Sequence, residues 1–211
     1  MPEFSKPIEA TANLDVVHII DDDERVRSSL LELFDSSGIR AEAFVDTADF
    51  DHRGDPQAAG CLLLDVKLPG MSGIEYQRKL SDAGFDLPIV FMTGDGDVPT
   101  SVTAMKAGAI DFLLKPFEVD ELLSAVTTAI EEGKKQREMA ARRRHARECA
   151  ASLTPRERQV MKLVTDGLMN KQAAYELGIS EIMVKLHRAS AMRKMQARSF
   201  SDLVRKSELL Q

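Results

Sequence analysis

The sequence predicts a doubly wound α/β domain with a five-stranded parallel sheet, joined by a helical linker to an all-α domain of four helices. Two observations lead to this fold class. Short apolar runs alternate with amphipathic segments over about the first 130 residues, which is typical of parallel α/β sheets. After residue 132 the strand-like runs stop, and the later segments have the apolar spacing of helices.

Four segments follow from this pattern: a disordered leader, an α/β domain, a linker and an all-α domain. Their predicted ranges are 1–13, 14–132, 133–152 and 153–211. Residues 1–132 carry 10 basic and 26 acidic side chains, a net charge of −16, whereas the linker and the last domain each carry +5. This asymmetry suggests that only the second half meets nucleic acid, although an ordinary solvated surface would explain it as well.

The composition disfavours several classes of protein. The chain has no run of about 18 apolar residues, so we expect no transmembrane helix and no membrane partner. Its N-terminus lacks the apolar core of a signal peptide. Two cysteines without a CxxC motif and four scattered histidines disfavour a disulfide, a zinc site and a histidine metal cluster. We therefore expect a cytoplasmic protein.

Five strands are predicted from short apolar or β-branched runs. Runs that are apolar throughout are typical of strands buried on both faces of a parallel sheet. The predicted strands are Val16–Ile20, Arg40–Val45, Cys61–Leu64, Leu87–Met92 and Ile110–Leu114.

Helices are predicted between these strands from apolar residues at three- and four-residue spacing. The first helix presents such a stripe and stops near Gly38, and a short helix follows the second strand. Ser72 could cap the third, which runs to about Asp82. The fourth starts near Val98 and is broken by Gly108.

The remainder of the chain reads as helical. From Glu118 onwards we expect the last helix of the α/β domain to continue into a long charged linker. Four helices follow. A short helix, a glycine-containing turn and a capped basic helix suggest a helix-turn-helix. The four are predicted to run from Thr154 to Gly167, over Asn170–Leu177, from Ser180 to about Met195, and over Asp202–Leu210.

Polar side chains stand at the ends of four predicted strands: Asp21 with Asp22, then Asp65, Thr93 and Lys115. The carboxyl ends of parallel strands meet at one edge of a sheet, where ligands bind. Carboxylates together with a backbone carbonyl form a hard oxygen site suited to Mg²⁺. Asp65 would then be a nucleophile that forms an acyl phosphate, while Lys115 and Thr93 stabilise the phosphoryl oxygens.

Residues 15–130 resemble a response-regulator receiver domain, whose fold is flavodoxin/CheY-like. The resemblance rests on four motifs: the acidic pair at 21–22, Leu-Asp-Val-Lys-Leu-Pro-Gly-Met-Ser-Gly at 64–73, Met-Thr-Gly at 92–94, and Asp-Phe-Leu-Leu-Lys-Pro-Phe at 111–117. It implies that Asp65 is the phospho-acceptor.

The resemblance also implies a magnesium site and a switch. Asp22 and Asp65 would be direct Mg²⁺ ligands, the Lys67 backbone carbonyl a third, and Asp21 a partner through water.

The switch would consist of the Thr93 hydroxyl, the phosphoryl-binding Lys115 and Phe112, which would turn inward on activation. Phe112 would equally suit the core, and Thr93 could simply end its strand. The resemblance further suggests a cis Lys115–Pro116 bond.

Residues 153–211 resemble the FixJ/LuxR-type helix-turn-helix domain. The matching stretches are Leu-Thr-Pro-Arg-Glu at 153–157, Gly-Leu-Met-Asn-Lys at 167–171, Leu-Gly-Ile-Ser at 177–180 and Val-Lys-Leu-His-Arg at 184–188. The recognition helix would extend from about Glu181 to Met195 and fit the major groove.

Contacts with DNA are assigned along this helix. Lys185, Leu186 and Ala189 share one face and are predicted to contact bases. Met183 stands where the family usually has threonine, so either a phosphate or helix-start contact is lost or Met183 reaches an apolar base edge. Basic side chains are assigned to phosphates, which position the protein without specifying sequence. They are Lys171, His187, Arg188, Arg193 and Lys194.

The function predicted is a phosphorylation-activated, DNA-binding transcriptional regulator of a two-component system, and not an enzyme. Its expected partners are a sensor histidine kinase, double-stranded promoter DNA and, when phosphorylated, a second copy of the chain. Two alternatives stay open. An aspartyl-phosphate hydrolase would usually have a second acid where Lys67 stands, and a DNA-binding protein with a decayed receiver would not need the intact acidic pair.

Overall fold

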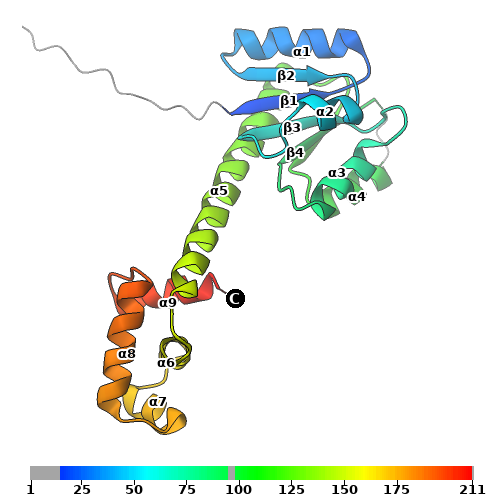
Figure 1. Ribbon diagram of the computed structural model, residues 1–211. Coiled ribbons are helices and arrows are strands. Elements are labelled where there is room, and N and C mark those ends of the chain that lie inside the picture. The colour runs from blue at the N-terminus through cyan, green and yellow to red at the C-terminus, as the bar shows by residue number, and fades with distance from the viewer. Residues whose placement is uncertain (1–14, 95–97, 211) are drawn as a thin grey trace, which may run out of the picture. The chain divides into compact units, whose positions relative to one another are not determined.

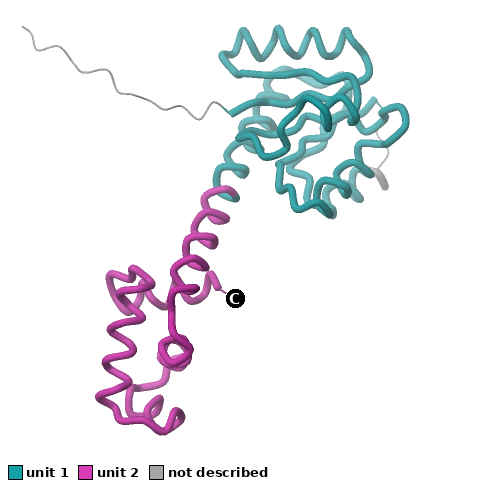
Figure 2. Tube along the Cα trace, viewed as in Figure 1, with its two compact units in different colours: residues 1–136 teal, residues 137–211 magenta. Residues whose placement is uncertain are grey.

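The computed structural model describes residues 15–94 and 98–210, so the predicted leader lies outside the described residues. The chain divides into two compact units, and the boundary in the sequence falls between Gln136 and Arg137 (Figure 2). Among the described helices, none combines the length and apolar character that a bilayer span requires.

The first unit contains a five-stranded parallel sheet with the strand order β2-β1-β3-β4-β5. The predicted fold class is confirmed. The fourth strand starts later than predicted because Pro88 lacks an N–H and offers only its carbonyl to Leu62 N, at 2.8 Å. The strands are β1 (Val16–Ile20), β2 (Arg40–Phe44), β3 (Gly60–Asp65), β4 (Ile89–Thr93) and β5 (Asp111–Leu114).

Helices cover both faces of this sheet (Figure 1). Alternate strand residues face opposite sides, so the sheet separates two apolar clusters. One cluster lies under α1 and α5, and the other under α2, α3 and α4. The helices are α1 (Glu24–Ser36), α2 (Thr47–Arg53), α3 (Gly73–Asp82), α4 (Val98–Lys106) and α5 (Val119–Ala151).

Side chains cap the starts of α1 and α3, and the cap of α3 is the predicted Ser72. Asp23 caps α1 and accepts a hydrogen bond from Arg25 N at 2.8 Å. Ser72 caps α3 in a reciprocal capping box with Glu75. These caps fix the helix starts that follow Asp21 and Asp65, the acids at the ends of β1 and β3.

The second unit contains the C-terminal part of α5 and four further helices. In its last turns α5 buries Ala146, Cys149 and Ala150, although the sequence assigns them to a linker. They belong to the same unit as Met161 and Leu203, with Cys149 and Ala150 packing in one cluster with these residues. The four helices are α6 (Pro155–Thr165), α7 (Asn170–Leu177), α8 (Glu181–Lys194) and α9 (Phe200–Glu208).

His18 is a buried histidine in β1. It is 2 % exposed, and its ring lies 5.9 Å from that of Phe44 and 5.3 Å from that of Phe50. Within the described residues, neither ring nitrogen has a hydrogen-bond partner. Burial lowers the pKa of His18, and the nearby carboxylates of Glu42 and Asp55 oppose this shift without cancelling it.

We expect this histidine to make the first domain less stable in weak acid. Below about pH 6.5 the unfolded chain binds a proton at His18 that the folded domain resists, so stability falls as the pH drops from 7 to 5. His18→Leu should remove up to about 1.4 kcal/mol per pH unit of that slope. Urea unfolding at pH 7, 6 and 5 measures it, with His52→Leu at an exposed position as the control. Parallel curves for wild type and His18→Leu would contradict the prediction.

Candidate functional site

Two carboxylates lie side by side at the carboxyl edge of the sheet. β1 and β3 are parallel neighbours, and their register pairs Ile20 with Leu64. Asp21, directly after β1, and Asp65, the last residue of β3, therefore lie side by side. They are 1 % and 5 % exposed, so both carboxylates are largely removed from water.

Lys115, which follows β5, pairs with both acids. Its Nζ lies 2.5 Å from Asp21 Oδ2 and 2.7 Å from Asp65 Oδ1. Three strand ends that are far apart in the sequence thus converge in one charged cluster, hereafter the acidic site. The sequence-predicted Asp21, Asp65 and Lys115 are brought into direct contact.

The electrostatics of the acidic site reflect its burial. Burial raises the pKa of Asp65, the hydrogen bond and charge of Lys115 oppose the rise, and the nearby Asp21 adds to it. Burial alone would lower the pKa of Lys115, but its bonds to the two acids outweigh this and raise it. The ammonium is therefore held in its charged form.

Backbone groups orient the two carboxylates. Lys67 N donates to Asp65 Oδ2 at 2.6 Å, and Asp23 N donates to Asp21 Oδ1 at 2.9 Å. Arg27, which the sequence analysis did not single out, donates from Nη1 to the Asp21 carbonyl at 2.8 Å. Arg27 is the fourth residue of α1, so this contact depends on how the chain turns from β1 into the helix.

The remaining predicted residues of this site differ in burial and in their contacts. Thr93 ends β4, is buried, and accepts a hydrogen bond on its carbonyl from Lys115 N at 2.7 Å. Asp22 is exposed beside Asp21. Phe112 is half-buried, with its ring 6.3 Å from that of Phe91. The Lys115–Pro116 bond is cis, as expected.

The donor set fits Mg²⁺ rather than a transition metal. Within the described residues, no group of three or more His, Cys, Asp or Glu side chains is placed to hold a metal alone. A hard cation that keeps several waters needs only one or two carboxylates and a carbonyl. Asp22, Asp65 and the Lys67 carbonyl can supply these, and Asp21 shares the Lys115 ammonium with Asp65.

Gly73, at the first position of α3, allows the backbone to pass close to the acidic site. A Cβ at this position would collide with the Asp65 carbonyl oxygen and press on Leu64 and Phe91. We expect Gly73→Ala to destabilise the first domain by about 2 kcal/mol, because the obstructing atom is backbone and cannot rotate away. Urea unfolding measures the loss. Gly94→Ala, where a Cβ has open space, should stay within about 0.5 kcal/mol of wild type, and equal stabilities for the two variants would contradict the prediction.

The second candidate site is α8, the predicted recognition helix. Its N-cap is Ser180, whose Oγ accepts a hydrogen bond from Met183 N at 3.3 Å, and the helix buries Val184 and Ala191 against its own unit. Its other side chains are exposed or half-buried. The three predicted base-contacting residues, Lys185, Leu186 and Ala189, are exposed, and so is Met183, for which two roles were left open.

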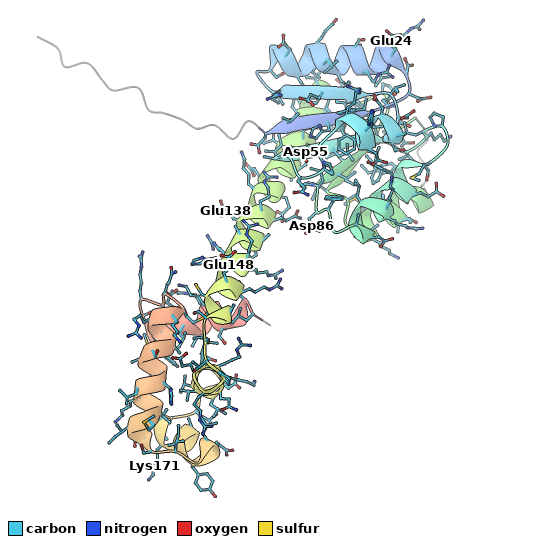
Figure 3. The ribbon with its side chains drawn as sticks, in the orientation of Figure 1. Glu24, Asp55, Asp86, Glu138, Glu148 and Lys171 are labelled. Carbon is cyan, nitrogen blue, oxygen red and sulfur yellow. The ribbon has the colours of Figure 1, made fainter. Side chains whose placement is uncertain are left out.

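The predicted phosphate-binding residues differ in their surroundings. Lys171 is exposed in the first turn of α7 (Figure 3), and Arg193 is exposed near the end of α8. His187 is half-buried. The Arg188 guanidinium lies 4.4 Å from the centre of the Phe200 ring, so it also ties α8 to α9.

Lys194 takes part in a polar link between α6 and α8. Its Nζ lies 2.7 Å from Glu157 Oε2, and Ser190 Oγ donates to Glu157 Oε1 at 2.7 Å. Glu157 also accepts from Thr154 N at 2.8 Å in a capping box. Lys194, Ser190 and Thr154 together lower the pKa of Glu157 to about 2. A DNA phosphate would therefore have to compete with this carboxylate for the Lys194 ammonium.

Two stretches of the chain match known protein families. Residues 17–127 match the family described as "Response regulator receiver domain", and residues 151–207 match "Bacterial regulatory proteins, luxR family". Nodulation protein W of Bradyrhizobium diazoefficiens is 47 % identical over 195 residues, which cover 92 % of this chain and 86 % of that protein.

Two further similarities span most of the chain. Transcriptional regulatory protein FixJ of Rhizobium meliloti is 40 % identical over 189 residues, covering 90 % of this chain and 93 % of that protein. The solved structure of the response regulator StyR matches with a TM-score of 0.77 and 44 % identity, covering 92 % of this chain and 98 % of that one.

Proposed function

The chain belongs to the two-component response regulators of the FixJ/LuxR type, a family of transcription factors and not of enzymes, and we propose that phosphorylation of Asp65 switches its binding to DNA. The observation that carries this proposal is the buried contact of Lys115 with both Asp21 and Asp65. This contact holds the Lys115 ammonium beside the Asp65 carboxylate, to which the phosphoryl group would be added. The intact cluster argues against a decayed receiver.

The phosphoryl donor is a phosphohistidine of a sensor histidine kinase. A carboxylate oxygen of Asp65 attacks phosphorus, the phosphorus–nitrogen bond breaks, and the departing imidazole takes up a proton. Lys115 stabilises the charge on the phosphoryl oxygens, supported by its position 2.7 Å from Asp65 Oδ1. Lys67 N, which already donates to Asp65 Oδ2, holds the carboxylate in place.

Mg²⁺ would be held by Asp22, Asp65 and the Lys67 carbonyl, with Asp21 acting through water. When bound, the cation offsets the negative charge that would otherwise keep an anionic phosphoryl group from the acids. Receiver domains typically use this ion, and the oxygen donors here suit it.

Phosphorylation of Asp65 changes the positions of two side chains, Thr93 and Phe112. The Thr93 hydroxyl moves to bind a phosphoryl oxygen, and the half-buried Phe112 ring turns inward at the margin of the core. The change in surface between α4 and β5 promotes pairing of two chains. Charge-assisted hydrogen bonds to phosphate can supply the few kcal/mol that such a change requires.

The output is α8 in the major groove of promoter DNA. Met183, Lys185, Leu186 and Ala189 are exposed and contact bases. The basic residues around them contact phosphates and set the register. These are Lys171, His187, Arg188, Arg193 and Lys194.

The test is binding to duplexes selected from a randomised library, followed by fluorescence anisotropy with and without acetyl phosphate and Mg²⁺. Phosphorylated wild type should bind about tenfold more tightly than untreated protein or treated Asp65→Asn. Equal binding in all samples would remove the switch and leave the DNA interface. Absence of sequence-selective binding in every sample would remove the interface.

A further inference from the structure

The recognition helix exposes an apolar patch that its own domain does not use. Ile182, Met183 and Leu186 are 70 %, 41 % and 57 % exposed, whereas Val184 and Ala191 on the same helix are fully buried. Helix α8 therefore carries apolar side chains on both of its faces, and only one face serves the core. We call Ile182, Met183 and Leu186 the apolar patch of α8.

The charges around this patch indicate a nucleic acid and not an apolar protein groove. Lys185 lies within it and is exposed, with its only described ion pair to Glu181 in the same helix at 3.1 Å. Arg188 and Arg193 follow along the helix. A cationic surround suits the phosphates that flank a major groove, whereas protein interfaces tend to exclude lysine from their centre.

The major groove offers one strongly apolar feature to such a patch. Of the four bases, only thymine presents a methyl group there. Ile182 and Leu186 lie four residues apart, a rise of about 6 Å, which spans about two base-pair steps of 3.4 Å. They can therefore reach methyl groups on base pairs about two steps apart.

We propose that Ile182 and Leu186 select DNA sites by contacting thymine methyl groups at two nearby positions. This inference rests on the proposed DNA-binding function and adds the chemistry of its specificity. The apolar contact supplies discrimination, while the basic residues supply affinity that does not depend on sequence. Ile182 was not among the residues singled out from the sequence, because its exposure depends on how α8 packs.

The experiment removes single methyl groups from the DNA. Full-length protein, phosphorylated with acetyl phosphate in Mg²⁺, is titrated against its selected duplex with each thymine replaced in turn by deoxyuridine. Loss of a buried methyl group should weaken binding about fourfold at the contacted positions and leave the others unchanged.

Variants assign each methyl group to its side chain. Leu186→Ala and Ile182→Ala should each lose the thymine preference at one position and keep it at the other. Tyr175→Ala is the matched control, because Tyr175 is a large side chain on α7 that is 87 % exposed. It should keep the thymine preference at both positions.

The outcomes separate this inference from the function on which it rests. Tight, sequence-selective binding that is indifferent to every deoxyuridine would overturn the inference and leave the DNA interface intact. The inference is equally overturned if Leu186→Ala and Ile182→Ala keep the wild-type thymine preference. Failure to bind any selected duplex would overturn the proposed function and the inference with it.

Discussion

Asp65→Asn is expected to reduce phosphoryl incorporation from acetyl phosphate by about a thousandfold or more. An asparagine side chain has nearly the same shape, and its single carbonyl oxygen can still accept one of the two hydrogen bonds that Lys67 N and the Lys115 ammonium donate to Asp65. It lacks the anionic oxygen that attacks phosphorus, so the loss would be chemical and not structural. Intact-mass spectrometry after incubation with acetyl phosphate and Mg²⁺ measures incorporation directly.

Asp23→Asn is the matched control for this experiment. It removes the same charge from the same acidic region, at an exposed position, and asparagine caps a helix as well as aspartate does. It should incorporate phosphate at close to the wild-type rate. Undiminished incorporation by Asp65→Asn would show that another residue is the acceptor.

Lys115→Met is expected to destabilise the first domain by about 3 kcal/mol at pH 7 without Mg²⁺. Methionine fills the space of the lysine stem but leaves Asp21 and Asp65, both nearly inaccessible to water, without the ammonium that joins them. The two buried carboxylates then repel each other, because the variant lacks the ammonium that separates them in the wild type. Urea unfolding of wild type and variant measures the difference.

Two changes of conditions identify the cause of that loss. Burial already raises the pKa of Asp65, and removing the ammonium raises it further, so the folded variant binds a proton before the unfolded chain does. Its deficit in stability should therefore shrink as the pH falls. Added Mg²⁺ should also restore part of it. Lys106→Met, at an exposed position of the same domain, should show none of these effects, and a pH-independent deficit would exclude the electrostatic explanation.

The acidic site could be predicted because strand ends are easy to locate. The apolar run before Asp65 and the β-branched run before Asp21 mark buried strands, and buried parallel strands must deliver their next residues to one edge. The position of Lys115 was predicted in the same way, because it directly follows the fifth strand. The contacts among these three residues confirm that they are neighbours, while their roles in phosphoryl transfer stay predictions.

Other features depend on distances that the sequence does not encode. Glu157 is recognisable as a capping-box residue, yet its bond to Lys194 depends on how α6 crosses α8. The unpaired ring of His18 and the exposure of Ile182 are likewise consequences of packing. A pattern of residue types identifies which face of an element is apolar but does not say what will cover it.

The burial of Ala146, Cys149 and Ala150 has a consequence for modularity. A gene fusion that joins a foreign receiver at residue 153 would remove these side chains from the output core, together with the Ala150 carbonyl that accepts a hydrogen bond from Arg158 Nη2 at 3.0 Å. The segment that must be exchanged together with the output domain therefore starts upstream of Ala146. This start lies inside α5, in the part that the sequence assigns to the linker. Recombination between regulators of this architecture would be tolerated best where it leaves those turns with the output domain.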